Sequence, residues 1–197
     1  MLHWWISVSF FMFSPSIEGG GQLISILTFF LIPIGIYDKR KWHWSINHSL
    51  NNVYSGIFIN SFYIIIRIQI AIVYFQAMVD KLKVSEWKNG TVLYYWFEDN
   101  VFGLNHFVKE FVLTLMTNYY VISLMTYTVL VLELLLAMAI VIPFKTRRIL
   151  LYLGILFHFF IWIVHGLPTF FLTMTGALII YIIPFYKNID LKHKNFN

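Results

Sequence analysis

The sequence predicts an all-α, multipass transmembrane helical bundle, and its composition and apolar runs lead to this fold class. Of the 197 residues, 59% are hydrophobic and only 12% are charged, whereas a soluble domain has about 25% charged residues. Long apolar stretches recur along the whole chain. The chain has no cysteine, which excludes disulfides, zinc–thiolate sites, iron–sulfur clusters and thiol redox chemistry.

Five apolar stretches are expected to span the membrane. At 1.5 Å per residue they cover about 24 to 40 Å, against a hydrocarbon core of about 30 Å. A sixth stretch, residues 2–13, is too short to span and looks like the end of a helix that begins earlier. We expect residues 1–186 to form one membrane domain and residues 187–197 to form a basic cytoplasmic tail. The five expected spans are residues 22–37, 53–79, 119–144, 149–165 and 169–186.

The basic residues predict the orientation of these spans. Alternating the spans places three basic clusters on one side, which the positive-inside rule makes cytoplasmic. The C-terminus is then cytoplasmic and the loop 80–118 faces outward, so the net charge of +5 requires no nucleic acid. The clusters are Lys39, Arg40 and Lys41, then Lys145, Arg147 and Arg148, and last Lys187, Lys192 and Lys194.

The outer loop contains one amphipathic segment. Its apolar residues recur at helical spacing, with polar residues between them, which predicts a helix. This helix either lies in the outer membrane interface or caps the bundle, and the sequence leaves both open. The apolar residues are Leu104, Phe107, Val108, Phe111, Val112 and Leu115.

Three ionisable residues fall inside the expected spans: Arg67, Glu133 and His158. Such residues are costly in a bilayer and indicate function by default. Arg67 lies about four helical turns from Lys81 at the outer end of its span, and Glu133 lies equally far from Tyr119 at the outer end of its own. Equal depth predicts that Arg67 and Glu133 form a buried ion pair or share a hydrogen-bond network, which is either functional or only fixes the register of the helices.

A pocket near the outer leaflet is the candidate site. Polar stripes on both sides of the second span, with Tyr74 on one and Gln69 on the other, predict a central helix. His158, Trp162 and His165 share one face of the fourth span, and Thr169 begins the last span. Together with Lys81 these residues are expected to line the pocket. Lys81 either extends to water or acts as a base in an apolar setting, and spacing alone does not decide.

The sequence lacks several catalytic patterns. It has no His-Glu-x-x-His metalloprotease motif, no Gly-x-Ser-x-Gly elbow and no glycine-rich phosphate loop. Its spans contain no pair of aspartates for an intramembrane protease. The two histidines of the fourth span do not specify a metal site, so no metal is predicted.

Two stretches carry a family resemblance. Residues 68–82 end in a Tyr-Phe to Lys-Leu pattern, and residues 86–90 follow with Trp-x-x-Gly. Residues 157–174 add a Phe-His-Phe, a His-Gly and a Phe-Phe. This pattern resembles the HTTM domain, a membrane domain shared by vitamin K-dependent γ-carboxylases and many bacterial relatives. Within it, the chain resembles the sporulation-delaying protein B family over nearly its whole length.

The resemblance implies a multipass protein of a bacterial plasma membrane that helps to produce or mature a secreted antimicrobial peptide toxin. Its implied partners are the toxin precursor, a small protein from the same operon and membrane lipid. In γ-carboxylases the lysine that matches Lys81 is the catalytic base, so the resemblance places Lys81 and His158 in catalytic roles. It also suggests a counterpart for Gln69, and it matches His48 through the short run Asn47–Ser49.

The chain departs from the family in two ways. Family members usually begin earlier, with further N-terminal helices, and the large luminal domain of the carboxylases has no counterpart here. Enzymatic activity therefore stays open, and a non-enzymatic membrane scaffold, peptide chaperone or immunity partner is the alternative. A transporter is disfavoured because no inverted repeat is visible. The sequence identifies no cofactor, and the resemblance leaves room for a quinone-like or lipid ligand.

Overall fold

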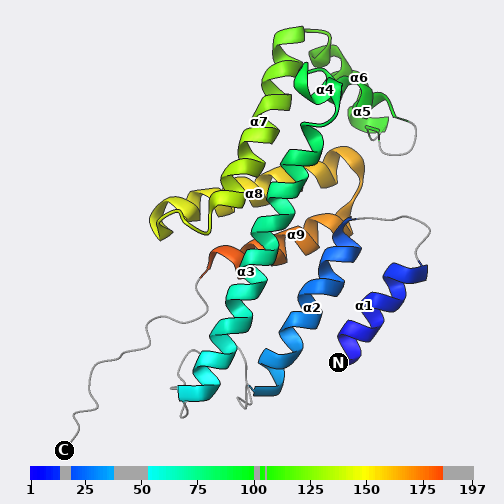
Figure 1. Ribbon diagram of the computed structural model, residues 1–197. Coiled ribbons are helices and arrows are strands. Elements are labelled where there is room, and N and C mark those ends of the chain that lie inside the picture. The colour runs from blue at the N-terminus through cyan, green and yellow to red at the C-terminus, as the bar shows by residue number, and fades with distance from the viewer. Residues whose placement is uncertain (14–18, 38–52, 100–102, 105, 184–197) are drawn as a thin grey trace, which may run out of the picture.

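The structure is a computed structural model that describes residues 1–13, 19–37, 53–99, 103–104 and 106–183. Every regular element in these ranges is a helix, which confirms the predicted all-α class (Figure 1). The expected tail, residues 187–197, lies outside the described residues. The helices are α1 (Leu2–Phe13), α2 (Gly19–Tyr37), α3 (Val53–Lys81), α4 (Ser85–Lys88), α5 (Val92–Glu98), α6 (His106–Met116), α7 (Tyr119–Met138), α8 (Phe144–His165) and α9 (Pro168–Ile182).

Within the described ranges, α2, α3, α7 and α8 are long and apolar enough to cross a membrane, which confirms a multipass protein. α1 and α9 are shorter apolar helices. The fifth expected span is therefore α9, whose 15 residues extend about 23 Å.

α3 is the axis around which the other helices pack (Figure 1). We call the Lys81 end of α3 its outer end and the Val53 end its inner end, after the orientation that the basic residues predict. α7 lies along the outer half of α3, and α2 lies along the inner half with α1 beside it. α8 and α9 form an antiparallel hairpin that runs across α3 and α7 rather than alongside them. Arg147, near the start of α8, interacts with Arg67 at the middle of α3 rather than with the first turns of α3.

The outer end of α7 extends beyond the outer end of α3. Tyr127, two turns into α7, donates a hydrogen bond to the Lys88 carbonyl at 2.7 Å. Its neighbour Thr126 donates to the Gly90 carbonyl at 3.2 Å. The first two turns of α7 thus stand level with α4 and α5, and only the later turns face α3.

Two apolar clusters fill the interior of the described bundle. The inner cluster joins α2, α3, α7, α8 and α9, and it contains the fully buried Ile66, Leu178 and Tyr181. The outer cluster joins α4, α5 and α6 to α7, and it contains the buried Trp87 and Phe97. The boundary between the two clusters lies at the outer end of α3, where the candidate site is found.

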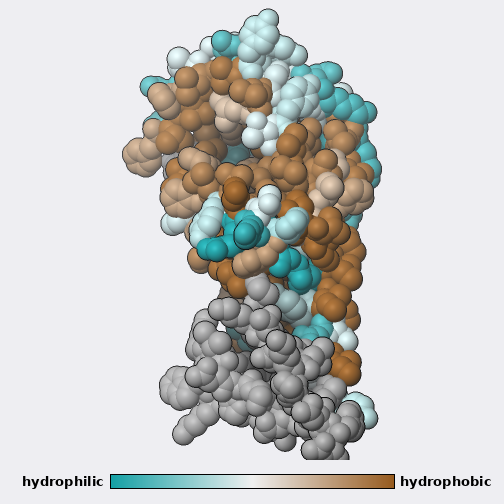
Figure 2. Space-filling model, turned by 90° about the vertical axis from the view of Figure 1, so that its left-hand side faces the viewer, coloured by the Kyte–Doolittle hydropathy of each residue, from teal (hydrophilic) through white to brown (hydrophobic). Residues whose placement is uncertain are grey.

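Much of the surface is also apolar, as a lipid environment requires. Phe75 of α3, Leu124 of α7 and Phe160 of α8 each expose half or more of their side chains. Figure 2 shows hydrophobic residues over a large part of one face, with hydrophilic residues gathered in a smaller area and at the outer end.

The amphipathic segment of the outer loop forms α6, as predicted. Val108, Val112 and Met116 pack on the outer cluster, so this side of α6 caps the bundle. Phe107 and Phe111 point outward with 93% and 71% exposure, as side chains in a membrane interface would. The packing therefore confirms the cap for one side of α6, and the interfacial position of the other side stays a prediction.

Two glycines make turns that other residues would strain. Gly166 ends α8 at φ +71° and leads into Pro168 at the start of α9, so the two helices are joined by a tight turn. Gly90, between α4 and α5, has φ +73° and lies against α7. A Cβ on Gly90 would lie 2.9 Å from the Ser123 hydroxyl and 3.1 Å from its Cα.

Gly90→Ala should destabilise the protein by at least about 1–2 kcal/mol, because alanine is strained at positive φ and its Cβ would displace α7. The measurement is the free energy of unfolding in detergent, followed by helicity. Gly176→Ala is the matched control, since a Cβ there meets nothing within 4 Å and alanine favours the helix. Equal stability of the two variants would contradict the proposed packing at Gly90.

Candidate functional site

An ion pair joins the outer end of α3 to the last third of α7. The Lys81 ammonium lies 2.7 Å from one carboxylate oxygen of Glu133, Oε1. The Lys81 side chain is 23% exposed and that of Glu133 is 7% exposed. The pair is thus buried on its carboxylate side and reachable on its ammonium side.

The short helix α4 covers this pair with an aromatic ring. Trp87 is 5% exposed, and its ring centroid lies 5.4 Å from the Lys81 ammonium. An indole face attracts a cation, most strongly where water is excluded. Lys81 is therefore held between a carboxylate and an aromatic face, and it does not extend freely to solvent.

Tyr74 and His158 lie on the inner side of the pair. Tyr74 is two turns before Lys81 on the same face of α3, and both Tyr74 and His158 are 2% exposed. Their rings meet edge to face, with centroids 6.1 Å apart. His158 Nδ1 lies 2.7 Å from the Gly154 carbonyl. Since a carbonyl only accepts, Nδ1 carries the hydrogen, which leaves Nε2 as an acceptor in the neutral ring.

Two polar atoms of this group have unused hydrogen-bonding capacity. The second carboxylate oxygen of Glu133 and the Tyr74 hydroxyl are buried and have no hydrogen-bond partner among the described residues. The Glu133 charge also acts on Tyr74, and the Lys81 charge acts on His158, so the four groups are close. We call Tyr74, Lys81, Trp87, Glu133 and His158 the Lys81 cluster. Because buried polar atoms are normally satisfied, the cluster has the character of a binding site for a small polar group.

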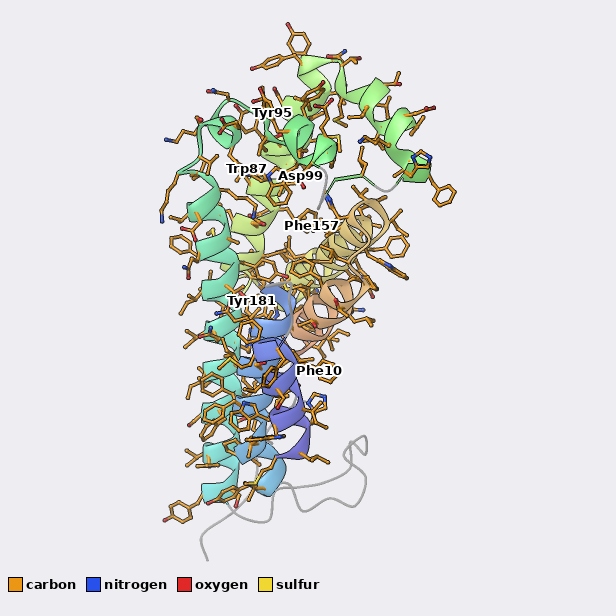
Figure 3. All side chains as sticks on the ribbon, turned by 90° about the vertical axis from the view of Figure 1, so that its right-hand side faces the viewer. Phe10, Trp87, Tyr95, Asp99, Phe157 and Tyr181 are labelled. Carbon is orange, nitrogen blue, oxygen red and sulfur yellow. The ribbon has the colours of Figure 1, made fainter. Side chains whose placement is uncertain are left out.

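A shallow groove lies on the outer side of the cluster. It has a volume of about 260 Å³ and is lined by Val84, Glu86, Val92, Tyr95 and Trp96. Figure 3 shows Trp87 and Tyr95 at this end of the molecule. Hydrogen bonds from its own backbone N–H and from Ser85 hold the pKa of the Glu86 carboxyl below its ordinary value. The groove is thus apolar with one negative charge at its edge.

The predicted ion pair between Arg67 and Glu133 is wrong. Glu133 pairs with Lys81, and Arg67 instead donates from Nε to the Tyr181 carbonyl at 2.9 Å. The depth estimate fails because it assumed that α3 and α7 end at one level. Since α7 extends beyond α3, Glu133 lies level with Lys81, about 21 Å from Arg67 along the α3 axis.

The other predicted site residues lie apart from the cluster. Gln69 is half-buried on α3, about three helical turns before Lys81. Trp162 stacks on Phe171 with ring centroids 5.3 Å apart, in a layer between α8 and α9. His165 lies near Trp96 and Phe97 of α5, and Thr169 is exposed at the start of α9. His48 lies outside the described residues.

Metal ligands do not gather in the described ranges, where no three His, Asp or Glu side chains come together. The Lys81 cluster itself offers one carboxylate and one imidazole. An organic ligand fits its mixture of aromatic faces and single polar atoms better than a metal ion does.

Comparison with known proteins identifies the family of this chain. Residues 22–185 match the HTTM domain. The chain belongs to the HTTM domain family. It is 37% identical over 193 residues to Sporulation-delaying protein SdpB of Bacillus subtilis (strain 168), covering 97% of this chain and 59% of that protein. It is also 32% identical over 198 residues to Uncharacterized protein YitO of the same organism, covering 98% and 62%.

The HTTM match confirms the resemblance seen in the sequence. The chain spans about six tenths of the length of both relatives. No solved structure matches the chain significantly.

The structure explains the Trp-x-x-Gly motif of this HTTM chain. Trp87 covers Lys81, and Gly90 allows the following turn to lie against Ser123 of α7. Sequence reasoning used Trp87 only as part of a family motif and gave Glu133 the wrong partner. Only the short spacing from Lys81 to Trp87 pointed to contact, whereas the Glu133 contact spans 52 residues of sequence and has no local signal.

A double-mutant cycle of Lys81→Met with Glu133→Gln should give a coupling energy of about 1–3 kcal/mol, because each single variant strands the other buried partner. A cycle of Arg67→Gln with Glu133→Gln should be additive to within about 0.5 kcal/mol. Both cycles are measured as free energies of unfolding in detergent. Strong coupling in the second cycle and none in the first would restore the pairing predicted from depth.

Proposed function

We propose that this HTTM protein takes part in the production or maturation of a secreted sporulation-delaying-type peptide toxin at the bacterial plasma membrane. Its partners are the toxin precursor, a small protein from the same operon and membrane lipid, and its C-terminus faces the cytoplasm. The similarity to Sporulation-delaying protein SdpB supports the pathway. The basic residues within 39–41 and 187–194 on one side of the predicted spans, against mixed basic and acidic residues in 80–110 on the other, support the orientation.

We place the chemistry at Lys81. The observation that carries this assignment is a lysine held 2.7 Å from a buried carboxylate while 23% of its side chain remains exposed. A lysine that merely extended to water would not be covered by Trp87. Its exposed side opens outward, where a secreted peptide or a lipid-borne ligand approaches.

The pair provides a route to a basic amine. Transfer of one proton from the Lys81 ammonium to Glu133 leaves a neutral amine with a free lone pair, which is the form that accepts a proton from a substrate. The Tyr74 hydroxyl and the Nε2 of His158 are then positioned to bind a polar group of that substrate. A quinone-like or lipid ligand fits the surrounding aromatic rings, and its polar oxygen would form hydrogen bonds with the groups of the cluster that have no partner.

The second candidate function is a non-enzymatic scaffold, peptide chaperone or immunity partner. The observation that favours it is the mutual neutralisation of Lys81 and Glu133, together with the complete burial of His158. A pair that only holds α3 against α7 would show both features. The two functions differ in what each requires of the Lys81 amine.

Lys81→Met should abolish toxin maturation, because methionine matches the length of the chain and cannot transfer a proton. The measurement is the mass and activity of the secreted peptide from cells carrying each variant. Lys83→Met is the matched control, since Lys83 pairs with Asp80 on the exposed surface and should leave maturation unchanged. Lys81→Arg keeps the charge and should also fail, because arginine does not give up its proton.

Folding is controlled with the double variant Lys81→Met/Glu133→Gln, which removes both charges of the buried pair. It should recover membrane insertion and stability and still fail in maturation. Normal peptide mass and activity with Lys81→Arg or with the double variant would instead support the scaffold.

A further inference from the structure

A second polar cluster lies halfway along α3, far from Lys81. Arg67 is midway between Val53 and Lys81, the first and last residues of α3, about 21 Å from each end of the helix. Its Nε donates to the Tyr181 carbonyl at 2.9 Å, and one turn earlier the Tyr63 hydroxyl donates to the Ile180 carbonyl at 2.7 Å. These bonds tie the end of α9 to α3, and Figure 3 shows Tyr181 at this level.

Arg147, in the first turns of α8, belongs to the same cluster. It lies within electrostatic range of Arg67, Tyr63 and Tyr181, so the two guanidinium groups act on each other. Arg67 Nη2 and Arg147 Nε are both buried, and neither has a hydrogen-bond partner among the described residues. Two cations with unused donors on neighbouring helices repel each other unless an anion lies near them.

The described residues supply no such anion. Glu133 is occupied by Lys81, and every other acidic residue of the described ranges falls in the outer segment 80–110. The remaining acidic residues of the sequence, Glu18, Asp38 and Asp190, lie outside the described residues. We call Tyr63, Arg67, Arg147 and Tyr181 the mid-α3 cluster. It differs in this respect from the Lys81 cluster, which contains its own counter-charge.

The start of α8 strengthens the positive potential. The helix begins at Phe144 without an acidic residue in its first turn and without a side-chain cap. Lys145, Arg147 and Arg148 all fall near its beginning. The N-terminal end of a helix carries a partial positive charge and stabilises anions, so these cations stand at its unfavourable end.

We infer that Arg67, Arg147 and the N-terminal turn of α8 form a binding site for a phosphate group, carried by a lipid headgroup or free in solution. Guanidinium groups match phosphate oxygens in pairs, and one phosphate has enough oxygens to accept from both arginines. Cations at depth in a bilayer also draw headgroups and water towards them. This site is independent of the proposed chemistry at Lys81.

The surroundings suit a lipid as the source of the phosphate. Val141, Phe144 and Ile149 flank the start of α8 and are 75%, 41% and 60% exposed. On the face where α8 begins, Figure 2 shows hydrophilic residues at mid-height bordered by hydrophobic ones. A phosphate seated among the arginines would leave acyl chains lying along these apolar side chains.

The test measures lipid binding to the full-length chain, purified in detergent and delipidated, by native mass spectrometry. The probes are phosphatidylglycerol, a diacyl glycolipid without phosphate and inorganic phosphate. Phosphatidylglycerol should bind the wild type, and Arg67→Gln and Arg147→Gln should each weaken it by about 10-fold or more, since each removes a charged hydrogen bond. The glycolipid should bind weakly to all variants.

Arg148→Gln is the matched control, because Arg148 lies in the same turn of α8 and is exposed. It should keep wild-type affinity, and an equal loss with Arg148→Gln would reduce the effect to general surface charge and overturn the site. Competition by inorganic phosphate would identify free phosphate as the ligand, and its failure to compete would identify the lipid. Where a glutamine variant does not fold, Arg67→Lys or Arg147→Lys replaces it. Lysine keeps the positive charge but lacks the planar guanidinium group that binds two phosphate oxygens at once.

An internal counter-ion is the competing explanation. If Asp38→Asn or Asp190→Asn creates phosphate binding that the wild type lacks, a carboxylate of the chain occupies the site and the proposal fails. Undiminished binding of phosphatidylglycerol by Arg67→Gln/Arg147→Gln would overturn it as well.

Discussion

The ion pair between Lys81 and Glu133 is the constraint on which the outer half of the structure depends. It lies where the two apolar clusters meet, and it joins the last residue of α3 to the last third of α7. A buried pair is a poor source of net stability, since desolvation offsets most of its attraction, but it penalises any register that separates the charges. The position of α7 against α3 is therefore specified by a polar contact, and the aromatic cover of Trp87 follows from that position.

The mid-α3 cluster shows the opposite solution to the same physical problem. At Lys81 the charge is compensated within the chain, whereas at Arg67 and Arg147 the donors remain open among the described residues. Both clusters lie on α3, about four helical turns apart, and so on nearly the same side of the helix. A cluster of cations without a counter-ion is stable in an apolar setting only when a bound molecule supplies the negative charge. The mid-α3 cluster therefore depends on an external anion, whereas the Lys81 cluster does not.

The sequence predicts the helices well, because long apolar runs and an amphipathic period are local signals. It also predicts Lys81, Tyr74 and His158 as members of one site, since their spacing places them on inward faces. The pairing of Glu133 could not be predicted, because it depends on how far α7 slides along α3. That offset also involves the packing of Gly90 against Ser123 and the hydrogen bond from Tyr127 to the Lys88 carbonyl, which have no local signal in the sequence. The crossing of the α8–α9 hairpin over α3 was missed for the same reason, since apolar length says nothing of crossing angle.

The position of His158 depends on Gly154, which has no side chain. A Cβ on Gly154 would lie 2.8 Å from a terminal methyl group of Leu178 and 3.3 Å from one of Leu136, so a larger residue there requires these two leucine side chains to shift. The Gly154 carbonyl sets the tautomer of His158 one turn later. The geometry around His158 is therefore a consequence of how α8 packs on α7 and α9, and a substitution remote from Lys81 and Glu133 reaches the cluster through this packing without altering either charge.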